Sequence, residues 1–171
     1  MFQIGDYIIY RNTGVCQVVQ IGIPENFSIL DSDVQYYFLE PLHGSGIIYI
    51  PVNSTVFMRP VISKEQAMEL IASIPTIPEQ PDYSKDQKAL HEHYKTLLQS
   101  HDCTALIQLI KNIHKKSAVL TAKGKNAGKT DLQYKKQAET LLHEELSIAL
   151  GIPVEEVPAY IRSQIENTSL A

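Results

Sequence analysis

The period of the apolar residues changes at Pro60, and this change is the strongest constraint on the fold. Before Pro60, short runs of β-branched and aromatic residues alternate with Gly, Pro, Asn, Asp or Ser, which is typical of small, half-buried strands. After it, apolar residues recur at spacings of three and four, which is typical of amphipathic helices. The sequence therefore predicts a two-domain α+β chain, with a β-module followed by an all-α half.

Five short strands are expected in the first 60 residues, over 7–10, 15–21, 36–40, 47–50 and 56–59. Gly14 punctuates the turn between the first two strands, and the run His-Gly-Ser-Gly over 43–46 has the composition of a hairpin connection. Five short strands in so few residues indicate a small β-barrel of the SH3 or Tudor kind.

A capping box formed by Ser63 and Gln66 predicts a helix over about 64–74. Three prolines then fall within the seven residues from Pro75 to Pro81, and we expect this stretch to be a semi-rigid linker. The predicted organisation is a Tudor-like module over 1–60, a helix with a Pro-rich linker over 61–81, and a helical domain over 82–171.

Three amphipathic helices are expected in the last of these segments, over 85–99, 103–119 and 131–150. Asp102 and Thr130 are the expected N-caps of the second and third helices. The third helix is expected to bury one face, made up of Leu132, Leu142, Leu146 and Ala149. A last helical element, with Pro158 in its first turn, completes the bundle.

Composition excludes several classes of protein. Cys16 and Cys103 are far apart and form no metal-type pair, so we expect no disulfide framework and a reducing cytoplasm as the setting. His91 and His93 point in different directions on a helix and cannot share a metal ion. No run approaches the roughly 20 apolar residues of a membrane span. We therefore expect a soluble cytoplasmic protein without a cofactor or a membrane.

The charge is distributed unevenly along the chain. Residues 1–83 carry three basic and nine acidic residues, a balance of −6, and residues 137–171 have a balance of −5. Between them, residues 84–136 carry eleven lysines against four acids, a balance of +7. The net charge of −4 therefore conceals a basic block between two acidic ones.

The lysines of this block are candidates for contact with phosphates. Lys111 and Lys115 lie four apart on one helix face, with Lys116 adjacent. The other candidates flank this helix in the sequence and are Lys85, Lys88, Lys123, Lys125 and Lys129. Contact with a nucleic-acid backbone and plain solubility both explain such a block, and the residues alone do not decide between them.

The run GKNAGKT over 124–130 is one residue too short for a phosphate-binding Walker loop, and it follows a helix where that loop follows a strand. We therefore interpret it as a basic loop. The sequence also contains no HExxH motif and no nucleophile elbow, so nothing in it indicates an enzyme.

The opening FQIGDYIIYRNTGVCQVVQI resembles the start of CarD-type bacterial transcription regulators and is similar to the polymerase-interacting domain of transcription-repair coupling factors. Further segments resemble the same family in the same order along the chain. They are residues 37–41, 48–52, 94–102, 109–113 and 141–161.

The resemblance implies a non-enzymatic regulator that binds RNA polymerase. In the family, a strand edge of the N-terminal module docks on the β subunit, and the matching residues here are Ile47, Ile48, Tyr49 and Ile50. The helical domain is implied to contact promoter DNA without reading its sequence and to modulate open-complex stability, and the chain is expected to be a monomer. A protein–protein adaptor without DNA contact is the alternative.

Five positions depart from the family pattern. Tyr83 stands where relatives commonly have a Trp that wedges into the minor groove, and this chain contains no Trp. Lys85 and Lys88 stand near that position in place of arginines. His101 replaces the Gly of a Ser-Gly-Asp junction, and Tyr49 replaces a residue that is basic in several relatives. We expect Tyr83 to retain stacking with less apolar area than Trp.

Overall fold

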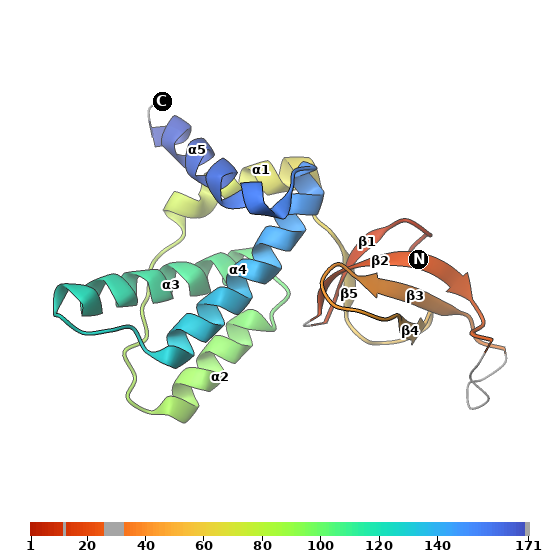
Figure 1. Ribbon diagram of the computed structural model, residues 1–171, viewed down its shortest axis with the longest axis horizontal. Helices are drawn as coiled ribbons and strands as arrows, with labels where there is room; N and C mark the ends of the chain where they lie inside the picture. The colour runs from red at the N-terminus through yellow and green to blue at the C-terminus, as the bar shows by residue number, and fades with distance from the viewer. Residues whose placement is uncertain (12, 26–32, 170–171) are drawn as a thin grey trace. The chain divides into compact units, whose positions relative to one another are not determined.

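The computed structural model describes residues 1–11, 13–25 and 33–169. The chain divides into two compact units, Met1–Val61 and Ile62–Ala171, and Figure 1 labels their strands and helices. This boundary lies within one residue of Pro60, where the apolar period changes. Each unit is described separately.

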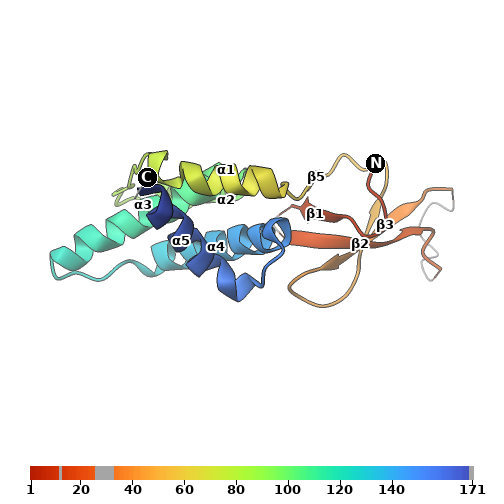
Figure 2. The ribbon, with the colours of Figure 1, turned by 90° about the horizontal axis from the view of Figure 1, so that it is seen from above.

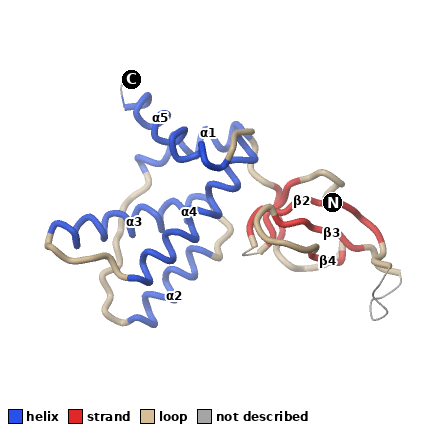
Figure 3. Tube along the Cα trace, viewed as in Figure 1, coloured by secondary structure: helices blue, strands red, loops and turns tan. Residues whose placement is uncertain are grey.

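The N-terminal unit is a five-stranded antiparallel sheet, drawn in red in Figure 3. Its strand order is β4-β3-β2-β1-β5. The strands are β1 (Tyr7–Tyr10), β2 (Gly14–Gly22), β3 (Tyr36–Pro41), β4 (Ile48–Pro51) and β5 (Met58–Pro60). Gly14 pairs with Tyr10 at the start of β2 with φ at 91°, a left-handed conformation that glycine adopts without strain.

One face of the sheet holds the apolar core, because alternate residues of each strand point to the same side. The core residues of this face are Ile8, Cys16, Val18, Tyr37, Leu39 and Ile50. The register between β2 and β3 shifts between Val18 and Gln20. Such an irregularity bends a strand and increases its twist.

The predicted barrel is not closed. Among the described residues, β4 and β5 lie at opposite ends of the strand order and do not pair with each other. Both are short, with four and three residues, and each ends in a proline that has no N–H to donate, Pro51 and Pro60. Within the described residues, β4 and β5 each pair with another strand on one side only, so the sheet has two edge strands, which a closed barrel does not have.

The C-terminal unit is helical (Figures 1 and 2). Its α-helices are α1 (Lys64–Ser73), α2 (Gln87–Leu98), α3 (Cys103–Ala122), α4 (Lys129–Leu150) and α5 (Val157–Ser169), with short 3₁₀ turns η1 (Ile74–Thr76) and η2 (Val154–Glu156). Helix α4 is central because it contacts each of the other four α-helices. Apolar side chains from all five α-helices form one core cluster.

The helix starts differ from the prediction at α4. The capping box at Ser63 and the N-cap at Asp102 are present as expected. Helix α4, however, begins at Lys129 with Gly128 as its N-cap, so Thr130 lies inside the first turn and caps nothing. This start places the side chain of Asp131 inside the unit, and Leu132, one residue on, is 49% exposed and not in the predicted buried face.

The Pro-rich segment packs on the helical unit and is not a free spacer. Ile77 is buried in the helical core. The backbone N–H of Gln80 donates to Oδ1 of buried Asn112 at 2.7 Å. The ammonium group of Lys111 donates to the carbonyl oxygens of Ile74 and Ile77, both at 2.7 Å. Helix α3 therefore holds the chain between α1 and α2.

A buried polar cluster joins three helices of this unit. The ammonium group of Lys116 on α3 lies 2.9 Å from Oδ2 of Asp131 on α4. The hydroxyl of Tyr94 on α2 donates to Oδ1 of the same carboxylate at 2.8 Å. Burial, followed by the hydrogen bond to Asp131, raises the pKa of Tyr94 well above its usual value. The phenol therefore stays protonated and keeps donating.

We predict that Lys116→Met lowers the free energy of unfolding by about 3–5 kcal/mol, because it leaves the buried carboxylate of Asp131 without its cation. Adding Asp131→Asn should recover part of this loss, since the amide is neutral and still accepts from Tyr94. Urea unfolding followed by circular dichroism measures both effects.

The exposed neighbour Lys115 provides the matched control, and Lys115→Met should change the unfolding free energy by less than about 1 kcal/mol. A double variant whose loss equals the sum of its two single losses would show that the pair is not energetically coupled.

Candidate functional site

The open edge of β4 is the first candidate site. On one side β4 pairs with β3, through the register Leu39–Ile48, Phe38–Tyr49 and Tyr37–Ile50. On the other side no described strand pairs with it. A strand from a partner can add to this edge, because main-chain hydrogen bonds extend a sheet beyond its edge strand.

The four residues predicted for docking play different parts at this edge. Ile47 and Tyr49 are 40% and 38% exposed. Ile48 is half-buried against the core, and Ile50 is buried within it. Ile50 can therefore offer a partner only its main chain, whereas Tyr49 can also offer its side chain.

The ring of Tyr49 lies on the face of the sheet opposite the core. It packs edge-to-face with Phe38 of β3, with ring centroids 4.9 Å apart. This aromatic pair adjoins the open edge of β4. It contributes apolar surface beside the main-chain groups that a partner strand would use.

The second candidate site lies at one end of the helical unit, where α2 begins and the loop between α3 and α4 runs (Figure 1). We call this surface the lysine-rich end. It comprises exposed side chains of the predicted set, namely Tyr83, Lys85, Lys88, Lys123, Lys125 and Lys129. A pocket of about 260 Å³ confirms that the three helices meet here, since Gln87, Leu120 and Lys129 all line it.

The turn before α2 is fixed by local hydrogen bonds. Asp82 accepts from the backbone N–H of Ser84 at 2.9 Å and from Nδ1 of His93 at 2.9 Å. These two bonds, the backbone one first, lower the pKa of Asp82 and keep it ionised near neutral pH. Tyr83 stands between these anchored residues and is 52% exposed. Its ring is thus presented to solvent by an ordered turn.

Residues 2–62 match a protein-family model described as the CarD-like/TRCF RID domain. The N-terminal unit is a CarD-like/TRCF RID domain. The RID is an RNA polymerase-interacting domain, a protein-interaction module without a catalytic role, so it gives this chain an RNA polymerase-interacting, transcription-related role. A search of curated proteins found no match to the chain.

The matched residues of the RID domain coincide with the sheet. All five strands lie between Tyr7 and Pro60, inside the matched range 2–62. The open edge of β4 therefore belongs to the RID domain, and the lysine-rich end belongs to the helical unit that follows it.

The three remaining lysines of the predicted DNA-contacting set interact with other groups of the helical unit. Lys111 is half-buried and donates to two carbonyls, and Lys116 is buried in its pair with Asp131. Lys115 is exposed, but its ammonium group lies 3.5 Å from Oε2 of Glu79. The inference that Lys111 and Lys116 offer their charge to a phosphate is corrected, because both charges are engaged inside the unit.

The junction between α2 and α3 shows a feature that the apolar pattern did not reveal. His101 adopts a φ of 61°, a left-handed conformation that residues other than glycine seldom adopt. The family pattern has Gly at this position, and this was the feature of the sequence that could have indicated a left-handed backbone conformation here. The backbone geometry of the junction is thus compatible with a glycine there.

Two features are absent from the part of the chain that the structure describes. Within it, no three side chains of His, Cys, Asp and Glu are grouped so as to hold a metal ion. None of its helices combines the length and the apolar character that crossing a membrane requires.

Proposed function

We propose that this chain is a non-enzymatic transcription regulator that acts without a cofactor. The RID domain binds the β subunit of RNA polymerase through the open edge of β4, and the lysine-rich end contacts promoter DNA and modulates the stability of the open complex. The open β4 edge inside a matched RID domain is the observation that carries the proposal.

Strand addition at β4 suits the chemistry of this edge. Main-chain hydrogen bonds supply affinity to any extended partner segment, and side chains that alternate along the strand supply selectivity. Tyr49 and Phe38 offer an aromatic surface on one face, while Ile48 and Ile50 belong to the core on the other. The other open edge, β5, has only three residues and pairs with β1 through them.

Backbone contact with DNA suits the lysine-rich end. Five exposed lysines lie there, and lysine ammonium groups bind phosphates without reading bases. The buried carboxylate of Asp131 does not oppose them, because Lys116 neutralises it. An exposed Tyr83 beside them can stack on an unpaired base.

A proline scan of β4 tests the docking edge. Consecutive N–H groups of an antiparallel strand point alternately to its two sides, so one of Ile48 and Tyr49 directs its N–H to the open edge. Proline has no N–H to donate. We therefore predict that one of the two variants, Ile48→Pro or Tyr49→Pro, removes the N–H at the open edge. This variant should lower the affinity for RNA polymerase at least about tenfold while leaving the sheet folded. Equilibrium binding to purified polymerase measures the affinity.

Two further measurements make this scan decisive. Thermal unfolding of each variant reports whether the ladder with β3 is intact, and Tyr49→Ala separates the side chain from the main chain. If both proline variants stay folded and bind polymerase like the unaltered chain, docking does not use β4.

The salt dependence of DNA binding tests the second site. Each phosphate contact adds about 0.9 to the slope of log affinity against log salt on duplex DNA. We therefore predict that replacing Lys123, Lys125 and Lys129 together by Gln reduces this slope by about 2 to 3. The matched control is Lys95→Gln, which removes an exposed charge elsewhere on α2 and should leave the slope nearly unchanged.

The adaptor remains the second candidate function. The net charge of −4 and the absence of Trp favour it, because both features weaken the case for DNA contact. An adaptor predicts that neither the lysine variant nor Tyr83→Ala changes the lifetime of the polymerase–promoter complex. The regulator predicts a shorter lifetime for both.

A further inference from the structure

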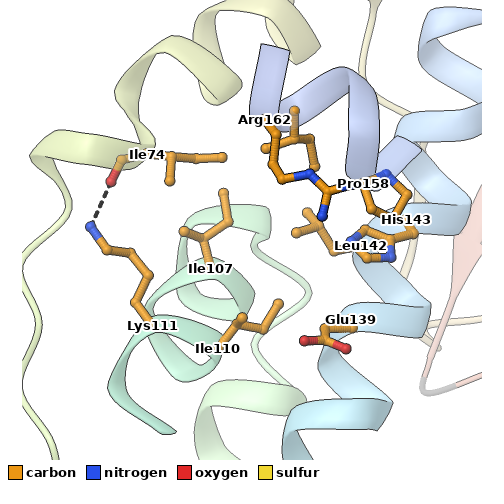
Figure 4. A pocket seen from close by; sticks show the side chains of 10 residues that line it. Ile74, Ile107, Ile110, Lys111, Glu139, Leu142, His143, Pro158 and Arg162 are labelled. Atoms are coloured by element: carbon orange, nitrogen blue, oxygen red, sulfur yellow. Dashed lines mark hydrogen bonds between the residues drawn. The ribbon is translucent and has the colours of Figure 1, made fainter. Parts of the chain in front are cut away.

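A small pocket lies within the helical unit, apart from the lysine-rich end (Figure 4). Its volume is about 250 Å³. Side chains reach it from α3, α4 and α5 and from Ile74 at the start of η1. In Figure 4, Lys111 lies on one side of the pocket, and Arg162 and Pro158 of α5 lie on the other.

The walls of the pocket are mostly apolar. Ile107 and Leu142 belong to the buried core, and the half-buried Ile74, Ile110 and Ile161 pack against them. Apolar surface that remains accessible to water lowers the free energy of binding when a partner covers it. The pocket can therefore receive an apolar side chain.

The polar groups at the rim leave one cation available. Lys111 donates to two backbone carbonyls, and Glu139 pairs with Lys135 at 3.7 Å. Burial lowers the pKa of His143 more than the nearby Glu139 raises it, so the imidazole is uncharged near neutral pH. Arg162 is exposed, and within the described part of the chain its guanidinium makes no ion pair.

We propose that this pocket binds an acidic amphipathic helix of a partner protein, with apolar side chains in the pocket and a carboxylate on Arg162. This site is separate from the polymerase-docking edge and does not depend on the proposed function. Two features of the pocket select this occupant. Its apolar floor favours apolar side chains, and the guanidinium of Arg162 at its rim, which has no ion pair within the described part of the chain, favours a carboxylate.

The size of the pocket favours a helix over a small molecule. Sites for small molecules usually measure about 300–1,000 Å³ and enclose most of the ligand. A pocket of about 250 Å³ is smaller and suits one or two anchoring side chains. Helices that bind in such grooves present apolar anchors one turn apart. A guanidinium binds a carboxylate in a two-pronged geometry, which fixes the orientation of the bound helix.

The test uses the full chain, labelled with ¹³C at isoleucine methyl groups, and a synthetic helical peptide as the probe. The peptide carries two leucines four residues apart and two glutamates on the same face, with alanine and glutamine elsewhere. We expect it to shift the methyl signals of Ile74, Ile107, Ile110 and Ile161. It should bind at least about fivefold more tightly than a control peptide in which both leucines are changed to alanine. The same difference is expected from a second control peptide in which both glutamates are changed to lysine.

Variants of the chain locate the effect. Arg162→Gln should abolish the preference for the glutamate peptide over the lysine peptide, whereas the control Lys95→Gln should retain it. Ile161→Phe fills the pocket from its rim and should weaken binding while leaving the remaining methyl signals dispersed, as in a folded chain.

Three results would overturn the proposal. The first is an absence of methyl shifts at millimolar peptide, and the second is equal binding of the glutamate and lysine peptides. The third is a shift of the pocket methyls by octanoate but not by the peptide, which would assign the pocket to a small carboxylate. None of these results bears on polymerase binding, so the two proposals fail separately.

Discussion

The helical unit depends on the buried pair between Lys116 and Asp131. This pair, completed by the hydroxyl of Tyr94, joins α2, α3 and α4 where these helices meet. A buried pair need not stabilise a fold more than apolar residues would, but losing one partner is costly. The pair therefore fixes which helices meet at the lysine-rich end, and it withdraws one lysine and one aspartate from the surface charge.

The two units are suited to different kinds of contact because their backbones differ. Among the described strands, β4 has a neighbour on one side only, and an edge strand of this kind can accept an added strand. The helices satisfy their backbone groups internally except at their ends, so they act mainly through side chains. The RID domain is thus suited to main-chain docking on polymerase, and the helical unit to charge and apolar contact. The residues from Ile62 to Gln80 belong to the second unit because α3 and α4 hold them through Lys111, Asn112 and Glu145.

Local patterns predicted the elements well and the long-range polar contacts poorly. The strand and helix types followed from apolar period, and the caps at Ser63 and Asp102 followed from residue type. Lys111 and Lys116 were assigned to a solvated face because four-residue spacing says which residues share a face and not what packs on it. Their partners lie 34 to 37 residues away at Ile77 and Ile74, and at Asp131 on another helix. Whether five strands close into a barrel likewise depends on register between ends distant in sequence.

The account places polymerase binding in the RID domain, and comparing fragments tests this placement most directly. Equilibrium binding to RNA polymerase should be measured for the full chain, for residues 1–61 and for residues 62–171, with circular dichroism confirming that each fragment is folded. The account predicts that residues 1–61 bind within about threefold of the full chain, since a factor of three is less than 1 kcal/mol. It predicts no measurable binding by residues 62–171. Capture of polymerase by residues 62–171 as strong as that by the full chain would contradict it.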